Sequence, residues 1–209
     1  MSCSTYDVFP GSGEHGEMKR KILVLGFFLS TLIAWTPSVH AQDDFQKGRT
    51  ELGFNVGLGG NFHINNNVRE DVDFYFLTPY WGKILKKWAQ GSTLEFIAEG
   101  FLSYANQDSE ARYAVGISPL IVYNFKEIWK IVPFLELGVG VLYTDLNPHG
   151  FGSHFDFTPQ AGVGLRYELA RGTFLNFSYR YHHISNAGIS SENDSIDSNF
   201  ILMGISFLR

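Results

Sequence analysis

The chain has 209 residues, a formal net charge of -5 at pH 7, 16% aromatic residues and 18% charged residues. The length fits one domain of ordinary size, the negative charge gives no sign of nucleic-acid binding, and a mean hydropathy of -0.05 excludes a helical membrane protein. Low charge combined with many Phe and Tyr residues is typical of a protein with a large apolar exterior.

The N-terminal residues 1–41 predict a leader and a secretory signal peptide. Residues 18–21 form a basic region, residues 22–35 are apolar, and Val39-His40-Ala41 is a small-x-small cleavage site. We therefore expect translation to start at Met18 and a mature domain to span residues 42–209. The alternative, a retained membrane anchor, is disfavoured because the apolar stretch is short and a cleavage site follows it.

The cysteine usage excludes several kinds of chemistry. The one cysteine, Cys3, lies in the predicted leader. A mature chain without thiols has no disulfides, no thiolate metal sites and no cysteine nucleophile. No histidine pair shows the spacing of metal ligands, so we expect neither a metal nor a cofactor.

Eight segments of strand length follow residue 42, separated by clusters of turn residues. Apolar side chains recur in them at every second position, which is the period of a strand. Eight strands are the smallest size of the closed outer-membrane barrels, so the pattern predicts an all-β fold, an eight-stranded antiparallel up-and-down transmembrane β-barrel. The predicted strands are Thr50–Phe62, Val72–Leu85, Thr93–Tyr104, Tyr113–Phe125, Val132–Thr144, Phe155–Leu169, Thr173–His183 and Asn199–Leu208.

The alternation also indicates which face meets lipid. In the first segment Leu52, Phe54 and Val56 share one parity, and small or polar residues such as Gly53 and Asn55 share the other. Small or polar residues on the second face suit a narrow interior filled with side chains. A soluble sandwich or lipocalin-like barrel would place the apolar face inside, but the secretion signal and the aromatic distribution favour the membrane form.

The connections between the predicted strands are unequal in length. With the N-terminus in the periplasm, the periplasmic turns are Lys86–Ser92, Lys126–Lys130 and Ala170–Gly172. The outer loops are His63–Asp71, Ala105–Arg112, Asp145–His154 and Ile184–Ser198. Short periplasmic turns and longer outer loops are the asymmetry expected of such barrels. Three tryptophans, Trp81, Trp88 and Trp129, fall near the periplasmic ends, where an aromatic girdle is expected.

The densest polar cluster lies at the outer tips of the last two strands. His183 and Ser185 share the parity of the apolar face of their strand, and Asp197, just upstream of the last strand, shares the parity of its apolar face. A histidine can take the proton of a serine hydroxyl, and a carboxylate can fix the tautomer of the histidine. The pattern alone leaves two interpretations open, a catalytic triad or inert polar residues at a strand end.

These residues resemble the outer-membrane lipid A 3-O-deacylases of the PagL type. The resemblance lies in His183-x-Ser185-Asn186, in Asn193 eight residues after the serine, and in Asp197 twelve residues after it. It covers the last fifth of the chain, and upstream the likeness is one of architecture. In that family an eight-stranded barrel carries a Ser-His-Glu triad on its outer surface and hydrolyses the ester at position 3 of lipid A.

The resemblance implies a role for each residue of the cluster. Ser185 would be the nucleophile, His183 the general base and then acid, and Asp197 the orienting acid. The oxyanion site would be formed by Asn193 with backbone amides around Asn186 and Gly188. Where the family has glutamate, this chain has Asp197, which is shorter by one methylene, while Glu192 stands nearer to the serine at the wrong offset.

The resemblance therefore predicts a serine esterase, a lipid A 3-O-deacylase of the bacterial outer membrane with its active site at the outer leaflet. Lipopolysaccharide would be the substrate and outer-membrane lipid the surroundings, with no nucleic-acid partner; whether the barrel forms a homodimer is left open. One alternative is a non-catalytic outer-membrane barrel for envelope integrity or adhesion. Another is an acyltransferase or phospholipase that uses the same triad.

Overall fold

The computed structural model describes residues 44–61, 72–107, 109–146, 153–190 and 195–209. The predicted leader and signal peptide lie outside these ranges. Within the described part of the chain, no helix has the length and hydropathy needed to cross a membrane.

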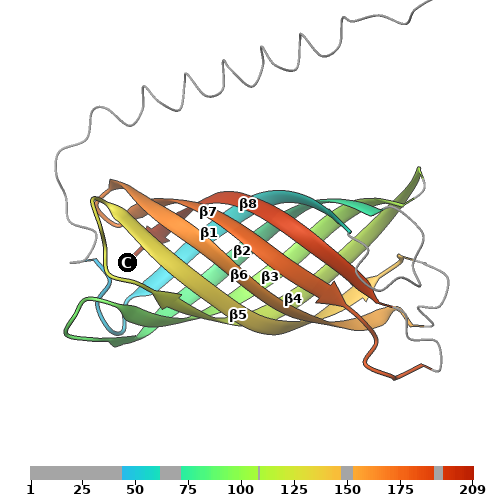
Figure 1. Ribbon diagram of the computed structural model, residues 1–209, viewed down its shortest axis with the longest axis horizontal. Helices are drawn as coiled ribbons and strands as arrows, with labels where there is room; N and C mark the ends of the chain where they lie inside the picture. Colours follow the sequence, from blue (N-terminus) through green and yellow to red (C-terminus); the bar gives the residue numbers. More distant parts are fainter. Residues whose placement is uncertain (1–43, 62–71, 108, 147–152, 191–194) are drawn as a thin grey trace, which may run out of the picture. The chain divides into compact units, whose positions relative to one another are not determined.

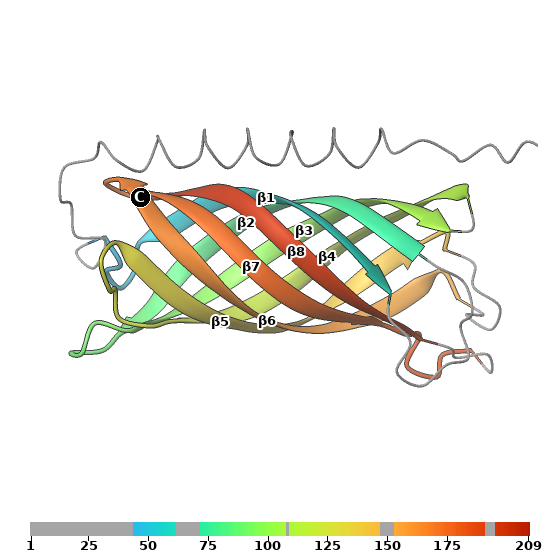
Figure 2. The same cartoon turned by 45° about the horizontal axis from the view of Figure 1, so that its top comes forward.

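Eight antiparallel strands form a closed barrel in chain order, and β1 pairs with β8 to complete it (Figure 1). The strands are β1 (Thr50–Asn61), β2 (Val72–Lys87), β3 (Thr93–Gln107), β4 (Glu110–Asn124), β5 (Ile131–Thr144), β6 (Phe155–Ala170), β7 (Thr173–Ile184) and β8 (Ile196–Leu208). All strands are tilted against the long axis of the barrel (Figure 2). The predicted eight-stranded up-and-down fold is confirmed.

The apolar parity faces outward, as predicted. On β1 the side chains of Leu52, Phe54 and Val56 are about half exposed, whereas Glu51 and Asn55, of the other parity, are buried inside the barrel. Exposed aliphatic and aromatic side chains continue around all eight strands. In a lipid bilayer the outward-facing side chains must be apolar, and every backbone N–H and C=O group must be paired within the protein. A closed barrel with an apolar exterior meets both requirements. The alternative of a soluble barrel with its apolar face inside is therefore wrong.

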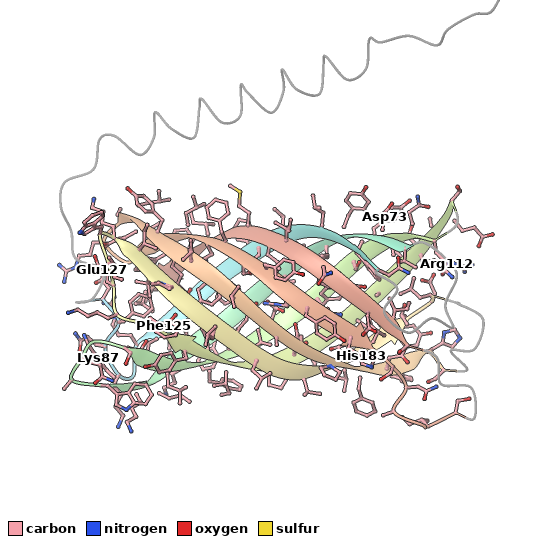
Figure 3. All side chains as sticks on the ribbon, viewed as in Figure 1. Asp73, Lys87, Arg112, Phe125, Glu127 and His183 are labelled. Carbon is pink, nitrogen blue, oxygen red and sulfur yellow. The ribbon has the colours of Figure 1, made fainter. Side chains whose placement is uncertain are left out.

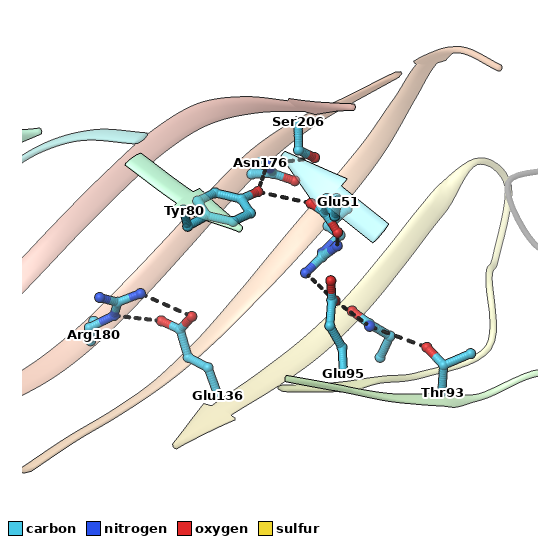
Figure 4. Close-up of polar contacts among 10 residues, drawn as sticks. Glu51, Tyr80, Thr93, Glu95, Glu136, Asn176, Arg180 and Ser206 are labelled. Carbon is cyan, nitrogen blue, oxygen red and sulfur yellow. Dashed lines mark hydrogen bonds and ion pairs between the residues drawn. The ribbon is translucent and has the colours of Figure 1, made fainter. Parts of the chain in front are cut away.

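Two buried arginines form ion pairs that join strands across the interior of the barrel. Arg180 on β7 donates from Nη1 to Glu99 on β3 at 2.6 Å. It also donates from Nε to Glu136 on β5 at 2.7 Å (Figure 4). Arg166 on β6 likewise donates to Glu51 at 2.5 Å and to Glu95 at 3.0 Å. Because buried charges are tolerated only when paired, these contacts fix the positions of strands that are not neighbours in the ladder.

Near the end of the barrel that carries His183, the inward-facing side chains are large and aromatic, whereas small or polar ones were predicted. Phe74, Phe76, Phe101 and Phe200 form an aromatic layer there, with contacting ring centroids 4.5 to 6.2 Å apart. The glycines of β1 make the room for it: a β-carbon at Gly57 would lie 2.3 Å from the ring of Phe76. The large and small residues therefore complement each other across the barrel, which the parity of a single strand does not reveal.

The connections differ in length between the two ends of the barrel. At one end they span residues 88–92, 125–130 and 171–172, and at the other 62–71, 108–109, 145–154 and 185–195. The predicted loop Ala105–Arg112 is wrong, because β3 and β4 continue until Gln107 pairs with Glu110. Ala105 and Gln107 are buried, so the alternation persists where the side chains become small and polar. We call the end with the longer connections the outer end, as in known outer-membrane barrels.

Candidate active site

Two of the three predicted catalytic residues, His183 and Asp197, stand directly opposite each other at the outer end of the barrel. His183 on β7 pairs with Asp197 on β8, which lies within the strand and not upstream of it. In Figure 3, His183 lies at the end of the barrel opposite to Lys87 and Glu127. The side chains of His183 and Asp197 are 27% and 24% exposed on the outside of the barrel. The neighbouring Ile184 is fully buried inside the barrel.

Ser185 follows the last residue of β7 but keeps the geometry of a strand. Its carbonyl accepts from the Phe157 amide of β6 at 2.8 Å, and its own amide donates to the Phe157 carbonyl at 3.1 Å. This pair of bonds holds Ser185 in the same parity as His183. A serine and a histidine two residues apart on one face are near enough for their side chains to meet.

The three side chains form one chain of hydrogen bonds. The Nδ1 atom of His183 lies 2.6 Å from Asp197 Oδ1, and its Nε2 atom lies 3.1 Å from Ser185 Oγ. Since an ionised carboxylate can only accept, Nδ1 carries the proton and Nε2 is left to accept from the serine hydroxyl. This order of acid, imidazole and hydroxyl is the arrangement that activates a hydroxyl for attack on a carbonyl.

A fourth side chain, which the sequence pattern did not predict, joins this series of hydrogen bonds. The hydroxyl of Tyr181 donates to Asp197 Oδ1 at 2.5 Å. Tyr181 pairs with Asn199 in the ladder, so it is the diagonal neighbour of Asp197. Diagonal neighbours on one face of an antiparallel pair lie within reach of an aromatic side chain. The shared parity of Tyr181 and His183, together with the register, was the signal that could have found this contact.

A tight turn follows Ser185. Ile189 donates its amide to the Asn186 carbonyl at 3.1 Å, and both central residues have positive φ, 53° at Ala187 and 82° at Gly188. These are the features of a type I′ turn. The amide of Gly188 donates to Asn186 Oδ1 at 2.8 Å, so this amide has an acceptor inside the turn. Asn186 and Gly188 thus hold the shape of the turn, and their part in oxyanion binding stays a prediction.

Two residues from the predicted site cannot be placed. Asn193, the predicted oxyanion donor, and Glu192, the disfavoured acid, lie outside the described residues. Among the described residues, no three His, Cys, Asp or Glu side chains are grouped to hold a metal ion.

An apolar groove of about 420 Å³ lies beside Tyr181 on the outside of the barrel. Its outward-facing lining comes mostly from β4, β5 and β6 and includes Pro119, Leu137, Val139, Pro159 and Ala161. The β4–β5 ladder is interrupted at Pro119, because proline has no N–H to donate. The groove therefore lies where the β4–β5 ladder is interrupted, and Tyr181 forms part of its lining.

The fold is that of outer-membrane barrels of known structure. It is similar to the crystal structure of the outer membrane enzyme PagL, with a TM-score of 0.56 and 23% identity over 74% of this chain and 97% of that chain. It is also similar to Neisserial surface protein A, with a TM-score of 0.54 and 14% identity over 76% and 96%. At these identities the likeness concerns the fold, and the chain is an outer-membrane β-barrel.

The sequence comparisons give the family. The family model described as lipid A 3-O-deacylase (PagL) matches residues 70–206, more than half of the chain. The lipid A deacylase PagL of Pseudomonas aeruginosa is 32% identical over 120 residues, which is 54% of this chain and 66% of that protein's length. The outer membrane protein AlkL of Ectopseudomonas oleovorans is 28% identical over 185 residues, 77% of this chain and 80% of that protein. The chain belongs to the lipid A 3-O-deacylase (PagL) family, as the resemblance predicted.

Proposed function

We propose that this protein hydrolyses the ester that joins a 3-hydroxyacyl chain to position 3 of lipid A, with Ser185, His183 and Asp197 as a catalytic triad. The observation that carries the proposal is the continuous chain of hydrogen bonds from Asp197 through His183 to Ser185. It lies on the lipid-facing side of the barrel, in a chain of the deacylase family.

The first half of the reaction forms an acyl-enzyme. Ser185 Oγ attacks the ester carbonyl carbon while its proton passes to His183 Nε2, and Asp197 stabilises the imidazolium that results. Amides of the turn at residues 186–188, together with Asn193, would donate to the oxyanion, the Gly188 amide after giving up its bond to Asn186 Oδ1. Each such donor is worth about 3 kcal/mol in the transition state. The intermediate then expels the sugar oxygen, which takes the proton from His183 and leaves the acyl group on Ser185.

The second half of the reaction releases the fatty acid. A water molecule gives a proton to His183 Nε2 and attacks the acyl carbonyl. The new tetrahedral intermediate expels Ser185 Oγ, which recovers its proton from the imidazolium. The products are a free 3-hydroxy fatty acid and a lipid A with a hydroxyl at position 3.

The position of the triad suits a substrate that is itself part of a membrane. A catalytic group on the outside of the barrel needs no water-filled pocket, because the bilayer brings the acyl chain against the apolar wall. The groove beside Tyr181 offers an apolar surface for such a chain. We place the triad at the level of the outer leaflet, since the outer end of the barrel carries the longer connections.

Mass spectrometry of lipid A tests the proposal. Expression of the native chain in a Gram-negative host is expected to remove one hydroxyacyl chain, and Ser185→Ala and His183→Ala are expected to leave lipid A intact. Heat-modifiable migration on gels would show that both variants still form the barrel. Continued loss of the chain with either variant would refute the triad.

The same experiment separates the alternatives. An unchanged lipid A profile with a folded native chain would favour a non-catalytic barrel. Transfer of the chain to another acceptor, or cleavage of phospholipids of known structure, would indicate an acyltransferase or a phospholipase.

We also propose that the mature protein begins at residue 42. The intact mass of the protein purified from outer membranes tests this, and a mass that includes residues 18–41 would contradict it.

A further inference from the structure

We propose that Tyr181 is a positioning residue that holds the carboxylate of Asp197 in place for His183; this rests on the proposed function. The Tyr181 hydroxyl donates to Asp197 Oδ1 at 2.5 Å. His183 Nδ1 bonds the same oxygen at 2.6 Å. One carboxylate oxygen thus receives both donors, so its position is fixed from two sides.

The register of β7 and β8 explains why both donors reach one oxygen. Tyr181 and His183 are two residues apart on β7 and project from the same face. Asp197 stands opposite His183, and Tyr181 lies two pairs further along the ladder, opposite Asn199. The tyrosine ring spans the diagonal, so its hydroxyl approaches the carboxylate from the side away from Ser185.

An aspartate at this place needs a second donor. Its side chain is about a quarter exposed at the rim of the barrel, where the carboxylate is free to turn toward water or lipid headgroups. A hydrogen bond to an ionised acceptor is stronger than a neutral one, and more so where water is partly excluded. Tyr181 therefore favours the rotamer of Asp197 that keeps the His183 tautomer competent to accept the serine proton.

The ring and the hydroxyl of Tyr181 can be separated by mutation. The ring lines the apolar groove on the outside of the barrel. Tyr181→Phe keeps that surface and removes only the hydroxyl. A loss of activity in this variant would therefore come from the missing hydroxyl and not from a change in the groove.

The chain offers a matched control two residues away on the same strand. Tyr179 lies on the same face of β7, and its hydroxyl donates to Asn199 Oδ1 at 2.6 Å. Tyr179→Phe removes a tyrosine hydroxyl that also bonds a side chain on β8, yet it leaves the triad and Asp197 untouched.

Steady-state kinetics with purified lipid A in mixed micelles test the proposal. Tyr181→Phe is expected to lower kcat about tenfold, the effect of losing one charge-assisted hydrogen bond, with KM within twofold of native. Tyr179→Phe is expected to stay within twofold of native in both constants. In an Asp197→Ala background, Tyr181→Phe should cause no further loss of kcat, because there is no carboxylate left to hold.

Three outcomes would overturn the proposal. They are an unchanged kcat in Tyr181→Phe, an equal loss of kcat in Tyr179→Phe, or the same tenfold loss when Tyr181→Phe is added to Asp197→Ala.

A readout that does not depend on turnover keeps this test apart from that of the proposed function. The His183 Nδ1 proton is expected to shift in NMR spectra of Tyr181→Phe, because Asp197 Oδ1 then has one donor fewer, and to stay in place in Tyr179→Phe. If the native chain is inactive, or if Ser185→Ala keeps full activity, the deacylase function fails, and the NMR shift still decides whether Tyr181 holds Asp197. The absence of a shift in Tyr181→Phe refutes the positioning role by itself.

Discussion

His183 and Asp197 are paired residues on neighbouring strands, and the imidazole Nδ1 lies 2.6 Å from the carboxylate Oδ1. Side chains at directly opposed positions of an antiparallel pair have β-carbons about 4.5 to 5.5 Å apart. An aspartate can therefore reach the histidine in spite of its short side chain. With this register Asp197 bonds the imidazole although it is one methylene shorter than the glutamate of the family.

Asp197→Asn is expected to lower kcat by about 10³ to 10⁴, because an amide in place of the carboxylate favours the wrong tautomer of His183. The barrel should fold as before, since the side chain lies at the rim. Deacylation of lipid A in mixed micelles measures the loss. Asp73→Asn is the control: this exposed aspartate lies at the same end of the barrel, on β2 (Figure 3). A loss in Asp197→Asn no greater than in Asp73→Asn would remove Asp197 from the triad.

The turn after Ser185 provides a second prediction. Gly188 has a φ of 82°, and a β-carbon there would meet no atom within 4 Å, so Gly188→Ala introduces backbone strain of about 1 kcal/mol without a clash. We expect kcat to fall several-fold as the turn beside the nucleophile shifts.

Gly48→Ala is the matched control for this substitution. Gly48 has a φ of 91° and equally open surroundings, but it precedes β1 at the opposite end of the barrel. It should show a similar small change in the urea midpoint and a native kcat. Equal kcat values for the two variants would show that the turn does not influence the nucleophile.

The groove beside Tyr181 yields a prediction on substrate binding. Ala161 is an exposed, lipid-facing residue of its lining, and Ala161→Phe would fill part of its volume of about 420 Å³. If the acyl chain binds there, KM for lipid A should rise while hydrolysis of a short-chain soluble ester changes little. Val56→Phe, on the lipid-facing side of β1, is the control for a larger residue on the wall. The same KM in both variants would place the acyl chain elsewhere.

Local pattern was enough to predict most of the fold and the grouping of the candidate site. The outward parity of Leu52 and Phe54, and the shared parity of His183 and Ser185, follow from the period of a strand alone. The contact of Tyr181 with Asp197 and the fit of Phe76 against Gly57 depend on register between strands, which no single segment encodes. The sequence pattern made β3 and β4 too short at their outer ends. Their backbone hydrogen bonds continue to Gln107 and Glu110, where the outward-facing side chains are no longer large and apolar.

The last prediction concerns the buried arginine beneath the site. Arg180 is 4% exposed and bonds Glu99 and Glu136 from one side of the barrel to the other. Arg180→Met keeps much of the volume but leaves two carboxylates without a counterion in the interior. Removing one partner of a buried ion pair costs about 3 to 5 kcal/mol, so the urea midpoint of the barrel in lipid vesicles, followed by tryptophan fluorescence, should fall markedly.

Two further variants identify the cause of that loss. Arg112→Met breaks an ion pair at the outer rim, where Glu110 is largely exposed, and should lower stability by less than about 1 kcal/mol. Adding Glu99→Gln and Glu136→Gln to Arg180→Met removes the unpaired charges and should restore most of the stability. If the triple variant is no more stable than Arg180→Met alone, the loss comes from packing of the arginine side chain, and the buried ion pairs are not what holds β7 to the far side of the barrel.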